Sequence, residues 1–331
     1  MQEFFDYQNF TEVPPEITEK KSIRRLAKTT GLALCGLFAI MFFWSLAFVR
    51  IMVVLGFNPK AALWFLNEPV IMQTLQILIS GIMLFVPFVL AVKFSNLKVR
   101  NLVMLKKPPN IKTTVLLTIM GLAFCQIVNI ATNIGAGVFQ MFGITFPDPQ
   151  IELPKGVFGI IVMLFSTAFF PAFFEEFVMR GLLLGLLKQK GNAFAVICSA
   201  LVFGFMHANA QQIVFAFFVG IILGFLTVKT ESIWPAVAVH FLNNLISVIF
   251  SYLNITKINS DIISLVYVIL FATILLFGVL CTIKISKQDS NFFTLHHQSE
   301  FTTQKKVCWF VTSPIIIISF VVSLLLAFFA R

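Results

Sequence analysis

Residues 171–181 read PAFFEEFVMRG, and this stretch decides how the rest of the chain is interpreted. It places Glu175, Glu176 and Arg180 inside a segment that is otherwise free of charge over residues 157–187. An ionised side chain at the centre of a bilayer costs roughly 2.5 to 3.5 kcal/mol on the insertion scale, so such a group marks a functional site by default. These three side chains are therefore the first candidate site residues.

The composition around this stretch is that of a membrane protein. The chain has 331 residues, of which 59% are hydrophobic and only 11% are charged, whereas a soluble fold carries about 25% charged residues. The net charge of +10 is interpreted by its position along the chain, and no nucleic-acid partner is expected. The five cysteines lie one per apolar segment without paired spacing, which favours neither a disulfide framework nor a Cys-ligated metal.

The apolar segments predict an all-α, polytopic transmembrane bundle. A span needs about 20 apolar residues, and only helices suit segments without strand-like alternation, because backbone groups in lipid must be satisfied internally. Residues 1–30 are expected to form a cytoplasmic tail, in which the pair Pro14-Pro15 makes regular structure unfavourable. Nine spans are predicted, at residues 31–49, 70–92, 114–138, 156–179, 192–208, 212–228, 234–252, 262–283 and 308–330.

The loop charges predict the orientation of these spans. With the N-terminus inside, 18 of the 24 Lys and Arg residues fall in inner segments and five in outer ones, with Arg180 inside a span. Cytoplasmic loops carry an excess of basic residues. We therefore expect the N-terminus in the cytoplasm and the C-terminus outside. The expected location is a bacterial plasma membrane.

The spacing within the central stretch divides the roles of its charges. Successive helix residues are about 100° apart, so Glu175 and Glu176 point in different directions, whereas Glu176 and Arg180 at i, i+4 share a face. This spacing predicts a buried ion pair between Glu176 and Arg180. Glu175 is left without a local counter-charge and is the candidate for taking a proton from water.

Two later spans add imidazoles. Phe203 and His207 lie one helical turn apart, as do His240 and Asn244. Imidazoles orient water, donate to an oxyanion or bind metal, and a carboxamide donates to an oxyanion. No serine or cysteine stands at comparable spacing, so water is the natural attacker and hydrolysis of an amide the natural reaction. Taken singly, a histidine in a membrane helix is more often a packed, hydrogen-bonded residue.

Three motifs in this order resemble those of the CAAX protease and bacteriocin-processing family of intramembrane proteases, also called the Abi family. Residues 175–180 match EExxxR, residues 203–207 match FxxxH and residues 240–244 match HxxxN. The resemblance covers roughly residues 155–250. It implies an eight-helix-type protease core with a conical, water-filled cavity that opens toward the cytosol. The chain would then divide into a tail, N-terminal helices (31–150), a catalytic core (151–253) and C-terminal helices (254–331).

The resemblance also implies a role for each motif residue. Glu175 and His207 would activate the water, while His240 and Asn244 would stabilise the oxyanion, and Glu176, Arg180 and Phe203 would support the site. Members of the family are described both as metalloproteases and as glutamate-dependent proteases. Zinc accepts two His and one carboxylate, so Glu175, His207 and His240 would be its ligands. We favour no obligatory metal, because HExxH, which puts two ligands and a base on one helix, is absent.

The leading hypothesis is therefore an intramembrane endopeptidase that cleaves a membrane-associated protein or peptide near the cytoplasmic surface. Relatives act on prenylated CAAX proteins or are linked to bacteriocin maturation and self-immunity, and neither substrate is chosen here. Two alternatives stay open. The first is a proton-coupled transporter that relays protons through Glu175, His207 and His240. The second is an inert self-immunity or scaffold protein.

Two further features of the predicted spans are the depth of the three site residues in the membrane and the polar face of the third span. Counting about 1.5 Å per residue puts Glu175 and His240 nearer the inner face but His207 nearer the outer one. Since the three must meet, we expect the fifth span to begin between residues 191 and 195 and to run past Asn209. In the third span, Gln126, Asn129 and Asn133 share one face, which favours interhelical hydrogen bonding and alternatively a wet cavity.

Overall fold

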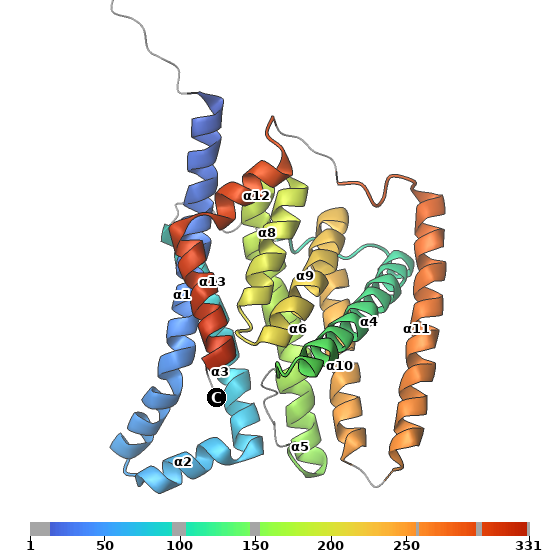
Figure 1. Cartoon of the computed structure of the whole chain (residues 1–331). Coiled ribbons are helices and arrows are strands. Elements are labelled where there is room, and N and C mark those ends of the chain that lie inside the picture. The colour runs from blue at the N-terminus through green and yellow to red at the C-terminus, as the bar shows by residue number, and fades with distance from the viewer. Residues whose placement is uncertain (1–13, 95–103, 146–152, 256–257, 296–299, 330–331) are drawn as a thin grey trace, which may run out of the picture.

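The structure is a computed structural model that describes residues 14–94, 104–145, 153–255, 258–295 and 300–329. These residues form a helical bundle without strands, which confirms the predicted all-α polytopic fold (Figure 1). A single isolated bridge pairs Leu105 with Ser232. The elements are α1 (Pro15–Val54), α2 (Pro59–Asn67), α3 (Pro69–Phe94), α4 (Ile111–Met141), α5 (Gly156–Met163), η2 (Leu164–Phe169), α6 (Phe170–Glu176), η3 (Phe177–Leu184), α7 (Gly185–Lys188), α8 (Asn192–Phe205), α9 (Ala210–Thr230), α10 (Trp234–Asn254), α11 (Ser260–Gln288), α12 (Thr303–Val311) and α13 (Pro314–Phe329).

The predicted count of nine spans is corrected by the described helices. Seven are long and apolar enough to cross a membrane, and α12 with α13 makes an eighth if this pair, bent by 70°, is one span. The predicted fifth span, residues 192–208, is the 14-residue helix α8. At 1.5 Å per residue, α8 is roughly 21 Å long, shorter than the hydrocarbon core of about 30 Å. The predicted ninth span, 308–330, is broken before Pro314.

The predicted N-terminal tail is also corrected, because α1 begins at Pro15 and includes the basic cluster of residues 20–28. Proline suits the first position of a helix, where its missing N–H has no partner to lose. The pair of prolines therefore starts the helix instead of preventing it. The earlier part of the tail, residues 1–13, lies outside the described residues.

One end of the bundle carries several ion pairs, and we call it the basic end. Lys106 and Lys188 both pair with Glu231, which lies between α9 and α10. Lys190, after α7, pairs with Glu19 of α1 at 2.7 Å. Four of the counted basic residues lie outside the described chain, namely Lys98, Arg100, Lys257 and Arg331.

The opposite end joins α10 to the segment before α5. The Tyr252 hydroxyl, in the last turn of α10, donates to the Pro154 carbonyl oxygen at 3.0 Å. Residues 156–188 form one continuous stretch of helix from this end to the basic end, through α5, η2, α6, η3 and α7. This stretch carries Glu175 and Glu176 near its middle, and it runs through the centre of the bundle in Figure 1.

The helices α8 and α9 form a tight antiparallel hairpin beside this central helix. A Cβ added to Gly220 of α9 would lie 3.0 Å from the Cα of Ala200 in α8, so the glycine permits this close approach. The connection spans only residues 206–209, and Ala208 there has a left-handed φ of 48°. The short turn holds His207 at the end of α8.

Candidate active site

The central helix changes its winding on both sides of the two adjacent glutamates. Residues 164–169 (η2) and 177–184 (η3) are π-helical, and the α-helical segment between them ends with Glu175 and Glu176. Single-turn π segments are rare and occur frequently at functional sites. The carboxylates thus sit where the regular hydrogen-bond pattern of the helix is interrupted.

Glu175 faces His207 across the gap between α6 and the α8–α9 turn. The Glu175 Oε2 atom lies 3.9 Å from His207 Nε2, and the two side chains are about one-fifth exposed. The His207 Nδ1–H donates to the Phe203 carbonyl oxygen at 2.7 Å. In a neutral ring with this tautomer, Nε2 carries a lone pair, so two acceptors face each other.

Glu175 and His207 lie at similar distances from the basic end because α8 is short. His207 lies 15 residues after the start of α8, and Glu175 lies 13 residues before the end of α7. At 1.5 Å per residue, both lie roughly 20 Å from the basic end. The expectation that this helix runs past Asn209 is wrong, because Asn209 caps the start of α9 and its side chain accepts from Gln212 N–H.

Glu176 is fully buried and holds two partners. Its Oε1 accepts a hydrogen bond from Arg180 Nη1 at 2.9 Å, as the i, i+4 spacing predicts. The same oxygen accepts from His240 Nδ1–H at 2.8 Å, a contact that the spacing does not predict. A carboxylate shared by a guanidinium and an imidazole fixes the position of α10 against the central helix.

Phe203 packs between the other motif residues. Its ring meets the rings of His207 and His240 edge to face, with centroids 5.1 and 6.0 Å apart. The Arg180 guanidinium carbon lies 4.1 Å from the ring centroid, in the geometry of a cation–π contact. Phe203 therefore orients His207 through its carbonyl oxygen and separates the two imidazoles with its ring.

Asn244 is bound to the backbone of the central helix. Its Nδ2 donates to the Thr167 carbonyl oxygen at 3.0 Å. In an α-helix this carbonyl would accept from residue 171, which is proline and has no N–H. The Asn244 amide gives the Thr167 carbonyl a donor from α10 close to Pro171, which has no N–H, and its second N–H is not used by this bond.

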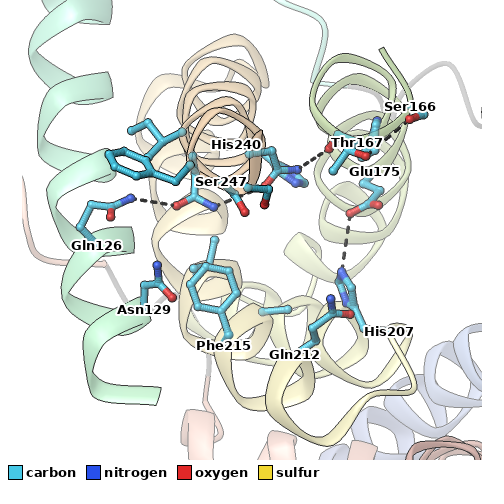
Figure 2. Close-up of a pocket in the computed structure, with 18 of the residues that line it drawn as sticks. Gln126, Asn129, Ser166, Thr167, Glu175, His207, Gln212, Phe215, His240 and Ser247 are labelled. Atoms are coloured by element: carbon cyan, nitrogen blue, oxygen red, sulfur yellow. Dashed lines mark hydrogen bonds and ion pairs between the residues drawn. The ribbon is translucent and has the colours of Figure 1, made fainter. Parts of the chain in front are cut away.

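The motif residues line one polar cavity of about 560 Å³ (Figure 2). Glu175, His207, His240 and Asn244 all contribute to its wall. From α4, Gln126 also lines it and donates to Asn243 Oδ1 of α10 at 3.2 Å. The polar face of the predicted third span thus makes an interhelical hydrogen bond and also borders a cavity.

A second, apolar cavity of about 420 Å³ lies on the other side of the Glu175–His207 pair. Its wall comes mainly from α1, α3 and α6 and includes Trp44, Met72 and Phe174. Glu175 and His207 line both cavities. The pair therefore lies at the boundary between a polar and an apolar space.

The grouping of potential ligands bears on the zinc site considered from the sequence. In the described part of the chain, no three His, Cys, Asp or Glu side chains are grouped so that they could hold a metal ion. We therefore derive no chemical step through a metal.

Sequence reasoning missed three features of the site, namely the His240–Glu176 bond, the bond from Asn244 to Thr167 and the π-helical segments. One of them had a signal. Pro171 stands four residues after Thr167, so in a regular α-helix the Thr167 carbonyl would need another donor. The other two depend on how α10 is rotated and on the local winding, for which the spacing carries no signal.

Comparisons with known proteins support the motif assignment. The family model described as "Type II CAAX prenyl endopeptidase Rce1-like" matches residues 157–246, which confirms the resemblance predicted from the three motifs. The "Putative membrane peptidase YdiL" of Bacillus subtilis (strain 168) is 28% identical over 117 residues, or 35% of this chain. The match spans about half of that relative, 48% of its length. No solved structure matches the chain.

Proposed function

From the Rce1-like segment of residues 157–246, we propose that the protein is an intramembrane endopeptidase that hydrolyses a peptide bond of a membrane-associated protein or peptide. The observation that carries this proposal is the Glu175–His207 pair, which faces a polar cavity inside a membrane bundle. Prenylated CAAX proteins and bacteriocin-like peptides are the two substrate classes that the family resemblance brings into consideration.

The proposed base is Glu175. Glu175 Oε2 and the neutral His207 Nε2 both accept hydrogen bonds and lie 3.9 Å apart, so the attacking water is proposed to donate one O–H to each. In the proposed reaction, Glu175 takes a proton as the water oxygen bonds to the carbonyl carbon of the substrate. Glu175 then passes this proton to the leaving amine, and the C–N bond breaks.

The developing oxyanion needs donors on the other wall of the cavity. Asn244 has one Nδ2–H bound to Thr167 and a second available. His240 keeps its Nδ1–H on Glu176, so its Nε2 donates to the oxyanion when the ring is protonated. Arg180 forms an ion pair with Glu176 and so helps to hold the carboxylate that positions His240. Glu176, Arg180 and Phe203 are thus proposed as positioning residues.

We also propose the orientation and location of the protein. The basic end is placed at the cytoplasmic face of a bacterial plasma membrane, because 18 of the 24 Lys and Arg residues fall in segments predicted to lie inside. The N-terminus is then cytoplasmic.

The proposal is tested by comparing the peptide termini of membrane proteins from cells with the wild type or with Glu175→Gln. We expect new termini to depend on Glu175, with a loss of cleavage of about 10²–10⁴-fold. The matched control is Glu68→Gln, a carboxylate change between α2 and α3, away from the polar cavity. Cleavage that persists in the Glu175→Gln, His207→Ala and His240→Ala variants would overturn the mechanism. Proton-linked transport without proteolysis would favour the transporter instead.

The absence of a required metal is proposed separately. We expect the purified enzyme to keep its activity after treatment with a zinc chelator, since the ligand geometry does not gather three donors in the described chain. Activity lost on chelation and restored by zinc would contradict this.

A further inference from the structure

The polar cavity extends from the motif residues away from the basic end. Along α10, its wall begins at His240, continues through Asn244, Ser247 and Ser251, and reaches Asn254, the last residue of that helix. From His240 to Asn254 the helix advances by 14 residues, which corresponds to roughly 21 Å at 1.5 Å per residue. Asn254 is exposed, so the cavity reaches the surface where α10 ends.

Two other helices, α9 and α11, contribute lining residues from near their first turns. Gln212 is two residues after the start of α9, and Tyr267 is seven residues after the start of α11. Both of these helix ends lie opposite the basic end, because α9 finishes beside Glu231 and α11 follows the loop after α10. The cavity is therefore a vestibule between the motif residues and the end where Tyr252 meets Pro154.

The basic residues lie at the other end of the same helices. Lys188 follows Glu175 on the central helix, Lys229 is in the last turn of α9, and Lys106 pairs with Glu231 just before α10. Basic segments of this kind face the cytoplasm. The cavity mouth and the cytoplasmic face are thus at opposite ends of the bundle.

We infer that the catalytic cavity opens on the extracytoplasmic face, so that the enzyme acts on a membrane-associated chain presented from outside the cytoplasm. This inference rests on the proposed function for its substrate, but the direction of opening rests on the cavity and the charges alone. It departs from the expectation, drawn from the family resemblance, of a cavity open to the cytosol.

The lining of the vestibule indicates the kind of segment that it accepts. Beyond Glu175, His207 and His240, the described lining residues are uncharged apart from the weakly acidic Tyr267. Amide and hydroxyl groups such as Asn243, Ser247 and Asn254 both donate and accept hydrogen bonds. An uncharged, extended peptide has unpaired N–H and C=O groups that these side chains match, whereas a highly charged segment would find no partner there.

The direction of opening is tested with single cysteines and a membrane-impermeant thiol reagent. Ser251→Cys reports on the vestibule, and Lys107→Cys, on an exposed residue, reports on the basic end. Both are made after Cys35 and Cys308 are replaced by serine, because the other three cysteines are buried. Intact cells and sealed inverted membrane vesicles are labelled in parallel.

We expect Ser251→Cys to be labelled in intact cells and not in inverted vesicles, and Lys107→Cys to show the reverse. Labelling of Ser251→Cys only from the cytoplasmic side, or from neither side, would overturn the inference. The proposed function fails separately, if the Glu175→Gln variant still cleaves. If the cavity opens outward and the protein is the proposed peptidase, labelling Ser251→Cys in intact cells abolishes peptide cleavage. Labelling Lys107→Cys in inverted vesicles leaves peptide cleavage intact.

Discussion

Glu175 and Glu176 are neighbours in sequence but belong to two different regions of the site. Glu175 lies between the polar and the apolar cavity, and its Oε2 has no hydrogen-bond partner among the described residues. Glu176 is fully buried, and its Oε1 accepts hydrogen bonds from Arg180 and His240. A turn of about 100° per residue along the helix is enough to place one carboxylate in a cavity and its neighbour in the core.

This difference separates reactivity from architecture. Glu175 borders the polar cavity and, among the described residues, has no ion-pair partner except the neighbouring His207, whereas Glu176 is enclosed in the core and bonded to Arg180 and His240. Removing one partner of a buried ion pair leaves an uncompensated charge. Substitutions in the two regions are therefore expected to act on different quantities, namely the rate of cleavage and the stability of the bundle.

The largest effect on stability is expected from Arg180→Met, which removes the cation and keeps the apolar bulk of the side chain. Glu176 would then be a buried charge with only His240 as partner, and we expect a loss of roughly 3–5 kcal/mol in the free energy of unfolding. Thermal unfolding of the protein in lipid nanodiscs measures this loss of stability. The matched variant Glu175→Gln should leave the unfolding midpoint nearly unchanged.

A double variant sharpens this comparison. Glu176→Gln combined with Arg180→Met removes both charges, so it should be more stable than Arg180→Met alone. If Arg180→Met unfolds no more readily than Glu175→Gln, the buried Glu176–Arg180 pair does not stabilise the bundle. The assignment of Glu176 to stability and Glu175 to catalysis is then wrong.

A smaller effect is expected where α10 is tied to the central helix. Asn244→Leu removes the donor to the part-buried Thr167 carbonyl, and losing a hydrogen bond of this kind costs about 0.5–1.5 kcal/mol. In a Pro171→Ala background, the backbone N–H of residue 171 is restored, so the same Asn244→Leu change should cost less. A double-mutant cycle on unfolding free energies measures this coupling. Equal costs in both backgrounds would mean that Pro171 does not create the need for Asn244.

The sequence carried enough information to predict the membrane bundle, the three motifs and the Glu176–Arg180 pair, because hydropathy and helical spacing are local properties. The depth of His207 could not be read in the same way. Its position depends on where α8 ends, and residues 192–208 are apolar enough to suggest a full span. The partner of His240 depends on how two distant helices are rotated against each other, for which the spacing of the motifs gives no measure.

The smallest effect is expected at Glu231, a third carboxylate, which lies at the basic end with its side chain about half exposed. A hydrogen bond from Lys106 lowers the pKa of Glu231 below its ordinary value, and the charges of Lys188 and Lys106 lower it further. A depressed folded-state pKa contributes stability that is present above the unfolded-state pKa, about 4.3, and is lost as the pH falls through the folded-state value.

For an exposed pair, this contribution is expected to be less than about 1 kcal/mol, because water and salt screen it. The wild type should therefore lose slightly more unfolding free energy than Glu231→Gln as the pH is lowered below about 5. The difference should shrink in high salt, unlike the effect of Arg180→Met, because the pair at Glu176 is buried and poorly screened. Equal salt sensitivity at Glu176 and Glu231 would mean that the buried pair is reached by solvent, and that burial does not distinguish the two.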